Sequence, residues 1–140
     1  MFTIALCLPG AAGQRAVRTL CEEYFAQRSE PCRIDAPAED APLAGYDLIF
    51  LSAAGPRPNG IDTAAALRRA GCRASVVFLA AGPEYAMDAF GVSALQYFIP
   101  PVSAARLAET LDRVLRVRRG PALAVSASSG LIRIGFSEIE

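Results

Sequence analysis

Two places in this sequence carry residue types that could do chemistry. Ser52 ends an apolar run, and its hydroxyl could serve as a nucleophile or as the target of a kinase. The loop 8–13, Leu-Pro-Gly-Ala-Ala-Gly, partly matches the dinucleotide-binding pattern G-x-G-x-x-G, with Asp35 at a later strand end as the acid that would bind a ribose. The first glycine of that pattern is missing, so a tight turn into a helix is the favoured interpretation.

The composition limits what Ser52 could do. All fourteen basic residues are arginines, and the chain has no histidine, lysine or tryptophan. Without histidine there is no Ser-His or Cys-His pair and no imidazole ligand for zinc; without lysine there is no Schiff base and no P-loop lysine. Because a weak nucleophile needs a base beside it, we expect Ser52 to be a structural hydroxyl.

The length of the chain indicates one folded domain, and its net charge of zero gives no overall preference for nucleic acid or anionic lipid. The chain has 140 residues, 53% of them hydrophobic, which suffices for one core but not for two of ordinary size. Fourteen basic residues balance fourteen acidic ones, so nothing global favours nucleic acid or anionic lipid. The four cysteines form no C-x-x-C pair, and the opening apolar run is too short for a membrane span. We therefore expect reduced thiols and a cytoplasmic protein.

Short apolar runs alternate with amphipathic stretches, which is typical of an α/β protein. We predict strands over residues 2–8, 32–35, 47–52, 75–80 and 95–99. We predict helices over residues 13–27, 61–70 and 83–90, a helix capped by Ser103 and ending near 119, and a rudimentary one at 37–44. Right-handed crossovers favour a doubly wound, five-stranded parallel sheet of order 2-1-3-4-5 with helices on both faces. Its site would lie at the carboxyl ends of the first and third strands, where the strand order reverses.

The chain changes character after Gly120. Residues 121–126 form another extended apolar stretch, 128–130 indicate a turn, and 131–134 alternate like a strand. About twenty residues cannot bury a core of their own. We expect residues 1–120 to form one domain and residues 121–140 to be a linker with the first residues of a truncated second domain.

Three groups of residues resemble the LytTR class of response regulators. Ile-Phe-Leu-Ser at 49–52, with Pro56 and Asn-Gly-Ile at 59–61, is similar to the phosphorylation strand and loop of its receiver domain. Residues 84–97, which include Glu-Tyr-Ala, Asp-Ala-Phe and Tyr97, are similar to its fourth helix and fifth strand. Residues 130–139, Gly-Leu-Ile-Arg-Ile with a later Ser-Glu-Ile, resemble the opening of the LytTR DNA-binding domain. The resemblance implies a flavodoxin-like fold.

The resemblance fails at the positions that carry the chemistry of a working receiver. Such a domain needs paired carboxylates to hold magnesium and an aspartate to accept phosphate. Leu8 and Pro9 stand where the family has its acidic pair, Ser52 replaces the phosphoacceptor, Ala80 replaces a hydroxyl residue and Pro100 replaces lysine. We expect a degenerate pocket with no catalysis, no metal and no cofactor.

These departures predict a pseudo-receiver, a phosphorylation-independent signalling and dimerisation module for transcription regulation. The family's usual contact face implies a homodimer interface near Tyr85, Phe90, Tyr97, Arg106 and Arg113. For Tyr97, at the family's aromatic switch position, we expect a packing role, and for the Pro100-Pro101 bond a cis peptide.

The family implies a histidine kinase or another regulatory protein as partner. It implies contact with DNA only through the C-terminal domain that would follow this chain, and no contact with a membrane. The alternative function is a small-molecule-binding or dinucleotide-binding α/β domain that uses the Leu8–Gly13 loop.

Overall fold

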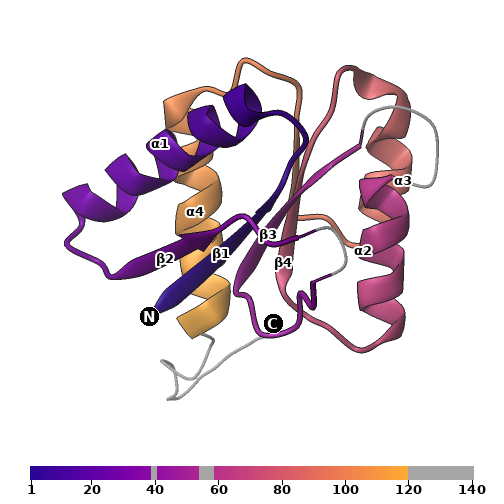
Figure 1. Cartoon of the computed structure of the whole chain (residues 1–140), viewed down its shortest axis with the longest axis horizontal. Helices are drawn as coiled ribbons and strands as arrows, with labels where there is room; N and C mark the ends of the chain where they lie inside the picture. Colours follow the sequence, from indigo (N-terminus) through magenta and orange to yellow (C-terminus); the bar gives the residue numbers. More distant parts are fainter. Residues whose placement is uncertain (39–40, 54–58, 120–140) are drawn as a thin grey trace, which may run out of the picture. The chain divides into compact units, whose positions relative to one another are not determined.

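The computed structural model describes residues 1–38, 41–53 and 59–119 (Figure 1). The chain divides into two compact units, Met1–Ala108 and Glu109–Glu140. The first unit contains every strand of the described residues, and the described part of the second is the helical stretch 109–119. The predicted strands at 121–126 and 131–134, and the predicted domain boundary at 120, lie outside the described residues.

The first unit is built on a five-stranded sheet. Its strands are β1 (Phe2–Cys7), β2 (Cys32–Asp35), β3 (Leu48–Ser52), β4 (Ser75–Leu79) and β5 (Gln96–Phe98). They lie in the order β2-β1-β3-β4-β5, and every pairing is parallel. The topology predicted from the sequence is confirmed. Strands covered on both faces read as continuous apolar runs, because side chains pointing either way are buried.

In the described ranges, four α-helices and one 3₁₀ turn connect or follow the strands. They are α1 (Ala11–Gln27), α2 (Gly60–Arg69), the turn η1 (Pro83–Tyr85), α3 (Ala86–Gly91) and α4 (Ala104–Arg119). Ser103 caps α4 as predicted, since its hydroxyl accepts a hydrogen bond of 3.3 Å from the Arg106 amide. No helix in the described ranges is long and apolar enough to span a bilayer.

One helical prediction is wrong, and a second is confirmed only in part. The described residues between β2 and β3 form no helix at 37–44; Pro42 has no amide proton to donate, and Gly45 has a φ of 97°. The helix predicted at 83–90 begins as the turn η1, and α3 starts only at Ala86. The Tyr85 amide donates to the Tyr97 hydroxyl, which draws this first turn toward β5.

The two faces of the sheet are covered by different helices of the first unit. Phe2 of β1 packs on Phe25 of α1, with ring centroids 5.3 Å apart. The opposite face packs with residues of α2 and α3 into one cluster, the α2/α3-side core: Ala5, Ile49, Leu51, Ala53, Ile61, Ala64, Val76, Phe78, Ala80 and Ala89. In Figure 1, α1 lies on one side of the strands and α2 and α3 lie on the other. In such a sheet, a functional site is expected at the carboxyl ends of the strands, between the helices on the two faces.

Candidate functional site at the carboxyl edge of the sheet

The five positions that would form a receiver's phosphorylation pocket lie at the same edge of the sheet. They are Leu8 and Pro9 after β1, Ser52 at the end of β3, Ala80 after β4 and Pro100 after β5. In the register, Cys7 lies beside Leu51, and Ser52 lies beside Leu79. Parallel strands thus bring these positions together at their carboxyl ends, although they are far apart in the sequence.

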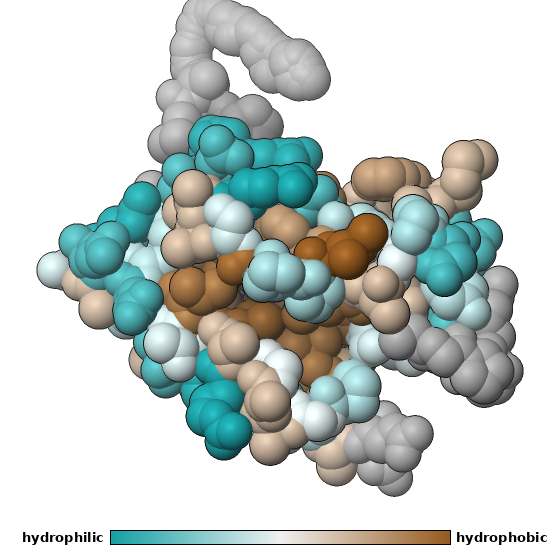
Figure 2. Space-filling model, turned by 90° about the horizontal axis from the view of Figure 1, so that it is seen from above, coloured by the Kyte–Doolittle hydropathy of each residue, from teal (hydrophilic) through white to brown (hydrophobic). Residues whose placement is uncertain are grey.

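This edge offers few groups for phosphoryl or metal chemistry. Leu8 and Ala80 are buried, Pro9 and Pro100 are exposed, and half-buried Ser52 has the only polar side chain of the five. Within the described residues, no group of three or more His, Cys, Asp or Glu side chains could hold a metal ion. Figure 2 looks onto this edge and shows apolar surface at its centre with polar surface around it. These five side chains provide neither carboxylates for magnesium nor a cation for phosphate.

The backbone around Ser52 is tightly packed. The Ala53 amide donates to the Leu79 carbonyl at 2.9 Å, which extends the β3–β4 ladder past Ser52. A Cβ atom on Gly60 would overlap the carbonyl oxygen of Ser52, so the first residue of α2 must be glycine for this approach. Asn59 and Asp62 form a capping box that begins α2 at this point. The Asn-Gly pair noted in the sequence therefore fixes α2 directly over Ser52.

The loop between β1 and α1 makes a tight turn. Gly10 has a φ of 83°, and Gly13 already lies inside α1. The Gln14 side chain donates from Nε2 to the Leu8 carbonyl at 2.7 Å and ties the helix to the strand end. Asp35, the acid considered for ribose, accepts hydrogen bonds from the Tyr46 hydroxyl at 2.8 Å and from Arg33 Nε at 3.1 Å. These contacts fit the turn interpretation, and dinucleotide binding stays an untested alternative.

A hollow of about 250 Å³ lies beside this edge, close to the strand ends where the sequence predicts a site. Its lining comes from β1, α1, the β2–β3 connection, β3 and α2: Leu6, Cys7, Leu8, Gln14, Pro37, Ala38, Leu43, Leu51 and Thr63. Burial raises the pKa of the Cys7 thiol, so the thiol stays neutral at physiological pH. The contribution of Pro37, Ala38 and Leu43 to the lining was not expected, because the sequence predicts a helix at 37–44.

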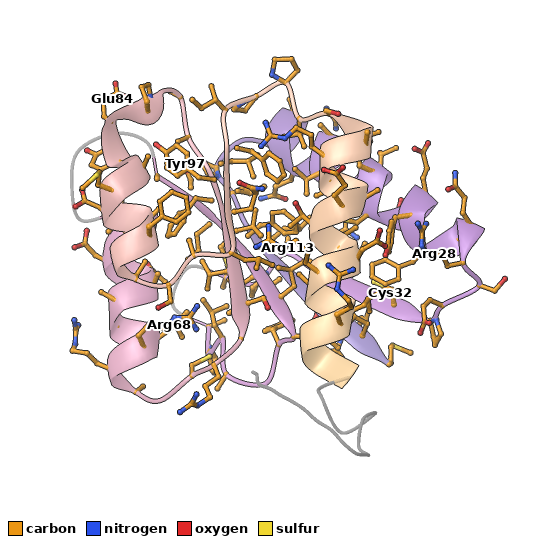
Figure 3. All side chains as sticks on the ribbon, turned by 180° about the vertical axis from the view of Figure 1, so that it is seen from behind. Arg28, Cys32, Arg68, Glu84, Tyr97 and Arg113 are labelled. Carbon is orange, nitrogen blue, oxygen red and sulfur yellow. The ribbon has the colours of Figure 1, made fainter. Side chains whose placement is uncertain are left out.

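Tyr97 connects β5 with the start of the η1 turn. Its hydroxyl donates to the Gly82 carbonyl at 2.5 Å and accepts a hydrogen bond of 3.3 Å from the Tyr85 amide. The Tyr97 and Tyr85 side chains pack against the α2/α3-side core. Figure 3 shows Tyr97 just below the turn that carries Glu84. The ring is thus held inside, against the turn that begins α3.

Arg68, at the end of α2, holds the other end of α3. Its guanidinium donates to the carbonyl oxygens of Val92 at 3.0 Å and Ser93 at 3.2 Å, which directly follow α3. It also donates to Cys72 and Ala74, at 3.0 and 2.8 Å. Figure 3 places Arg68 far from Tyr97 along the α2/α3 side of the unit. No pattern in the sequence indicates this role, because a helical arginine usually points into solvent.

Four of the five residues predicted to border a dimer contact belong to the first unit. Phe90 is 60% exposed, Tyr85 and Tyr97 are half-buried, and Arg106 is exposed with its guanidinium 5.5 Å from the Phe98 ring centroid. Arg113 lies in the second unit and is exposed. Met87 on α3, which the sequence reasoning overlooked, is 85% exposed. The bond between Pro100 and Pro101 is cis, as predicted.

The strand order, the parallel pairing and the covering helices define a receiver-type α/β fold, and solved structures agree. The response regulatory domain of mrkE from Klebsiella pneumoniae aligns with a TM-score of 0.64 at 18% identity, covering 81% of this chain and 95% of that chain. A DNA-binding response regulator of the LuxR family from Staphylococcus aureus aligns with a TM-score of 0.64 at 16% identity, covering 83% and 100%. At these identities the likeness shows the fold.

Curated relatives match about half of the chain. The chain is 36% identical over 73 residues to the positive alginate biosynthesis regulatory protein of Pseudomonas aeruginosa and to the sensory transduction protein LytT of Bacillus subtilis. It is 38% identical over 72 residues to the transcriptional regulatory protein BtsR of Escherichia coli. These matches cover 51–52% of this chain but only 29–30% of each relative. No family model matches the sequence.

The resemblance to response-regulator receiver domains is therefore confirmed. Three further relatives are named response regulatory proteins, and the structural neighbours include the response regulatory domain of mrkE and the receiver domain of DrrB.

Proposed function

We propose that this chain is a degenerate receiver domain that neither catalyses a reaction nor depends on phosphorylation. It acts as a signalling and dimerisation module of a LytTR-type transcription regulator. The observation that carries the proposal is the carboxyl edge, where Leu8, Pro9, Ser52, Ala80 and Pro100 provide one hydroxyl, no carboxylate and no cation.

Removal of the acidic residues has an energetic consequence for the whole domain. Clustered carboxylates repel one another, and a bound cation or a transferred phosphate changes that balance between conformations. An apolar edge has no such repulsion for a ligand to relieve. The domain consequently stays in one conformation, with or without magnesium.

The anchoring of α3 supports a single conformation. The Tyr97 hydroxyl holds the turn before α3, and Arg68 holds the residues directly after it. Neither contact involves a residue of the degenerate pocket. Their hydrogen-bonding partners are backbone atoms, which remain present whatever occupies the strand ends.

The exposed side chains of α3 support an interaction role. Met87 and Phe90 expose large apolar surfaces, which mark contact sites more often when they lie together. We propose a homodimer contact that includes Phe90 and has Tyr85, Tyr97, Arg106 and Arg113 as neighbours. The regulatory relatives suggest a histidine kinase or another regulatory protein as a further partner.

Sedimentation of the full chain against concentration tests this function. We expect the same monomer–dimer equilibrium in buffer, with magnesium, and with magnesium plus beryllofluoride, a phosphoryl analogue. Phe90→Ser should weaken the dimer, whereas Ala66→Ser, a matched change at an exposed position of α2, should not. A shift of the equilibrium on adding beryllofluoride would show that phosphate-type switching survives and would overturn the proposal.

A further inference from the structure

We propose that Cys21 of α1 and Cys32 of β2 form a redox modification site, in which a peroxide converts the two thiols into a disulfide. Both cysteines are free in the structure. They lie where α1 covers the edge strand β2, away from the helix α3. Figure 3 shows Cys32 at the opposite side of the view from Tyr97 and Arg68, which hold α3. The site is therefore independent of the proposed dimer contact.

One hydrogen bond fixes the level of α1 against β2. Arg18 Nη1 donates to the Ile34 carbonyl oxygen at 3.1 Å. Arg18 lies one turn before Cys21 on α1, and Ile34 lies two residues after Cys32 on β2. A helix that connects two parallel strands runs opposite to them, so both cysteines lie on the same side of this bond. Rises of about 1.5 Å per helical residue and about 3.3 Å per strand residue bring them to within about 2 Å of the same level.

Both side chains face the space between α1 and β2. Cys21 and Phe25 belong to the buried face of α1, and the Phe25 ring packs on Phe2, the neighbour of Cys32 in the β1–β2 ladder. Cys32 lines a hollow of about 220 Å³ together with residues of α1, so it lies on the face of β2 that α1 covers. Negative charge on Cys32 also raises the pKa of Cys21, which is expected of neighbouring thiols.

The oxidant reaches Cys32 first. Cys32 is half-buried and borders the hollow, whereas Cys21 is fully buried. The Cys32 thiolate attacks one peroxide oxygen, which breaks the O–O bond and gives a sulfenic acid. Cys21 then attacks the Cys32 sulfur, and the S–S bond forms as the hydroxyl group leaves as water. With hydrogen peroxide, two thiols are oxidised to one disulfide, and the peroxide is reduced to two water molecules.

The other two cysteines lie elsewhere in the first unit. Cys7 ends β1 and packs against the α2/α3-side core, on the face of the sheet opposite α1. Cys72 lies between the end of α2 and the start of β4. Along the sequence, Cys7 is only slightly farther from Cys21 than Cys32 is. The fold therefore selects Cys32 as the partner of Cys21.

Peptide mapping after oxidation of the full chain tests the pairing. The chain is treated with hydrogen peroxide in mildly alkaline buffer, free thiols are alkylated, and trypsin then cuts after arginine. Cys21 lies in peptide 19–28 and Cys32 in peptide 29–33. We expect these two peptides, joined by a disulfide, as the main cross-linked product of the folded chain. The absence of this product would overturn the proposal.

Oxidation of the urea-unfolded chain is the control for the role of the fold. Loop closure depends only weakly on loop length. The unfolded chain should therefore join peptide 19–28 to peptide 1–15, which carries Cys7, about as often as to peptide 29–33. The same mixture from the folded chain would show that chain proximity alone selects the partner, and would overturn the site.

Two matched variants test the order of the steps. In Cys32→Ser, the buried Cys21 has no sulfenic acid to attack, so its thiol should be lost to peroxide at least about tenfold more slowly. Cys72→Ser, a change at another half-buried cysteine, should leave that rate unchanged. Circular dichroism checks that both variants are folded. Loss of the Cys21 thiol at the same rate in Cys32→Ser would contradict the pairing.

Urea unfolding shows whether the disulfide fits the native structure. A bond between residues that already lie together restricts mainly the unfolded chain, so the oxidised chain should unfold at a higher urea concentration than the reduced chain. A lower midpoint would mean that the bond distorts the contact between α1 and β2, and would overturn the site. Sedimentation of the reduced chain reports separately on the proposed function.

Discussion

Ser52 has a hydroxyl at the right strand end, but the side chains around it set its chemistry. Leu8 and Pro9 stand where two carboxylates would hold magnesium, and Pro100 stands where a cation would neutralise phosphate. The close approach of Gly60 to the Ser52 carbonyl further fixes the backbone at this position. At the scale of single residues, the proposed degeneracy is shared among several positions, so we expect that a change at one of them does not reverse it.

Ser52→Asp alone should not restore phosphorylation. The variant supplies an acceptor, but magnesium still lacks the carboxylates that would hold it beside a phosphoryl donor. We expect no magnesium-dependent labelling by acetyl phosphate, measured as a mass increase of the intact chain. A competent receiver labelled in parallel serves as the positive control. Stoichiometric labelling of the single variant would mean that Leu8 and Pro9 are not the cause of the deficiency.

At the scale of elements, α3 is the part whose position depends most on side chains from elsewhere. It has six residues and is preceded by a 3₁₀ turn, so few of its backbone hydrogen bonds lie within the helix. Tyr97 from β5 and Arg68 from α2 fix its two ends. The exposed Met87 and Phe90 lie on this helix, between the two anchoring contacts.

Arg68→Ala should destabilise the fold, whereas Arg69→Ala should not. Arg68 donates to four backbone carbonyls, and its loss leaves acceptors around the α3 end unpaired, at a cost of about 2 kcal/mol. Arg69 is exposed on the same helix, so its change should stay within about 0.5 kcal/mol. Urea unfolding measures both values, and hydrogen exchange at Ala94 should accelerate in Arg68→Ala. Equal stability of the two variants would argue against the anchoring role.

At the scale of the whole molecule, the buried Cys21 and half-buried Cys32 thiols make the free energy of unfolding depend on pH in the alkaline range. Burial raises the pKa of Cys21 to about 12 and that of Cys32 to about 11, from an ordinary value of 9.0. The unfolded chain therefore releases thiol protons at a pH where the folded chain keeps them. This contribution to stability is fully present below pH 9.0 and is lost as the pH rises through the folded-state values.

The free energy of unfolding should consequently fall with rising pH above about 9. Urea titrations at pH values from neutral to strongly alkaline measure the slope. A Cys21→Ala/Cys32→Ala variant should show a shallower slope, even though it starts from a lower stability because of the cavity at Cys21. The Tyr46 hydroxyl, whose pKa is raised by its hydrogen bond to Asp35, adds a decline in the same direction in both proteins. An identical slope in the two proteins would contradict the role of the thiols.

The sequence by itself determined the order of elements and the character of the strand ends. Apolar runs such as Leu48–Ser52 identify buried strands, short connections limit the topology, and a missing carboxylate is missing in any conformation. Predictions from local sequence were less accurate where a residue from another element makes a contact. At η1, for example, the Tyr85 amide donates a hydrogen bond to the hydroxyl of Tyr97 on β5.

Only the tertiary structure decided the features that depend on contacts across the sequence. The partners of Arg68 lie up to 25 residues away, and no local pattern distinguishes it from the exposed Arg69 beside it. The hollow likewise needs β1, α1, the β2–β3 connection, β3 and α2 in place before it exists. Sequence periodicity reports which face of an element is buried, whereas the shape of the space between elements depends on how they pack.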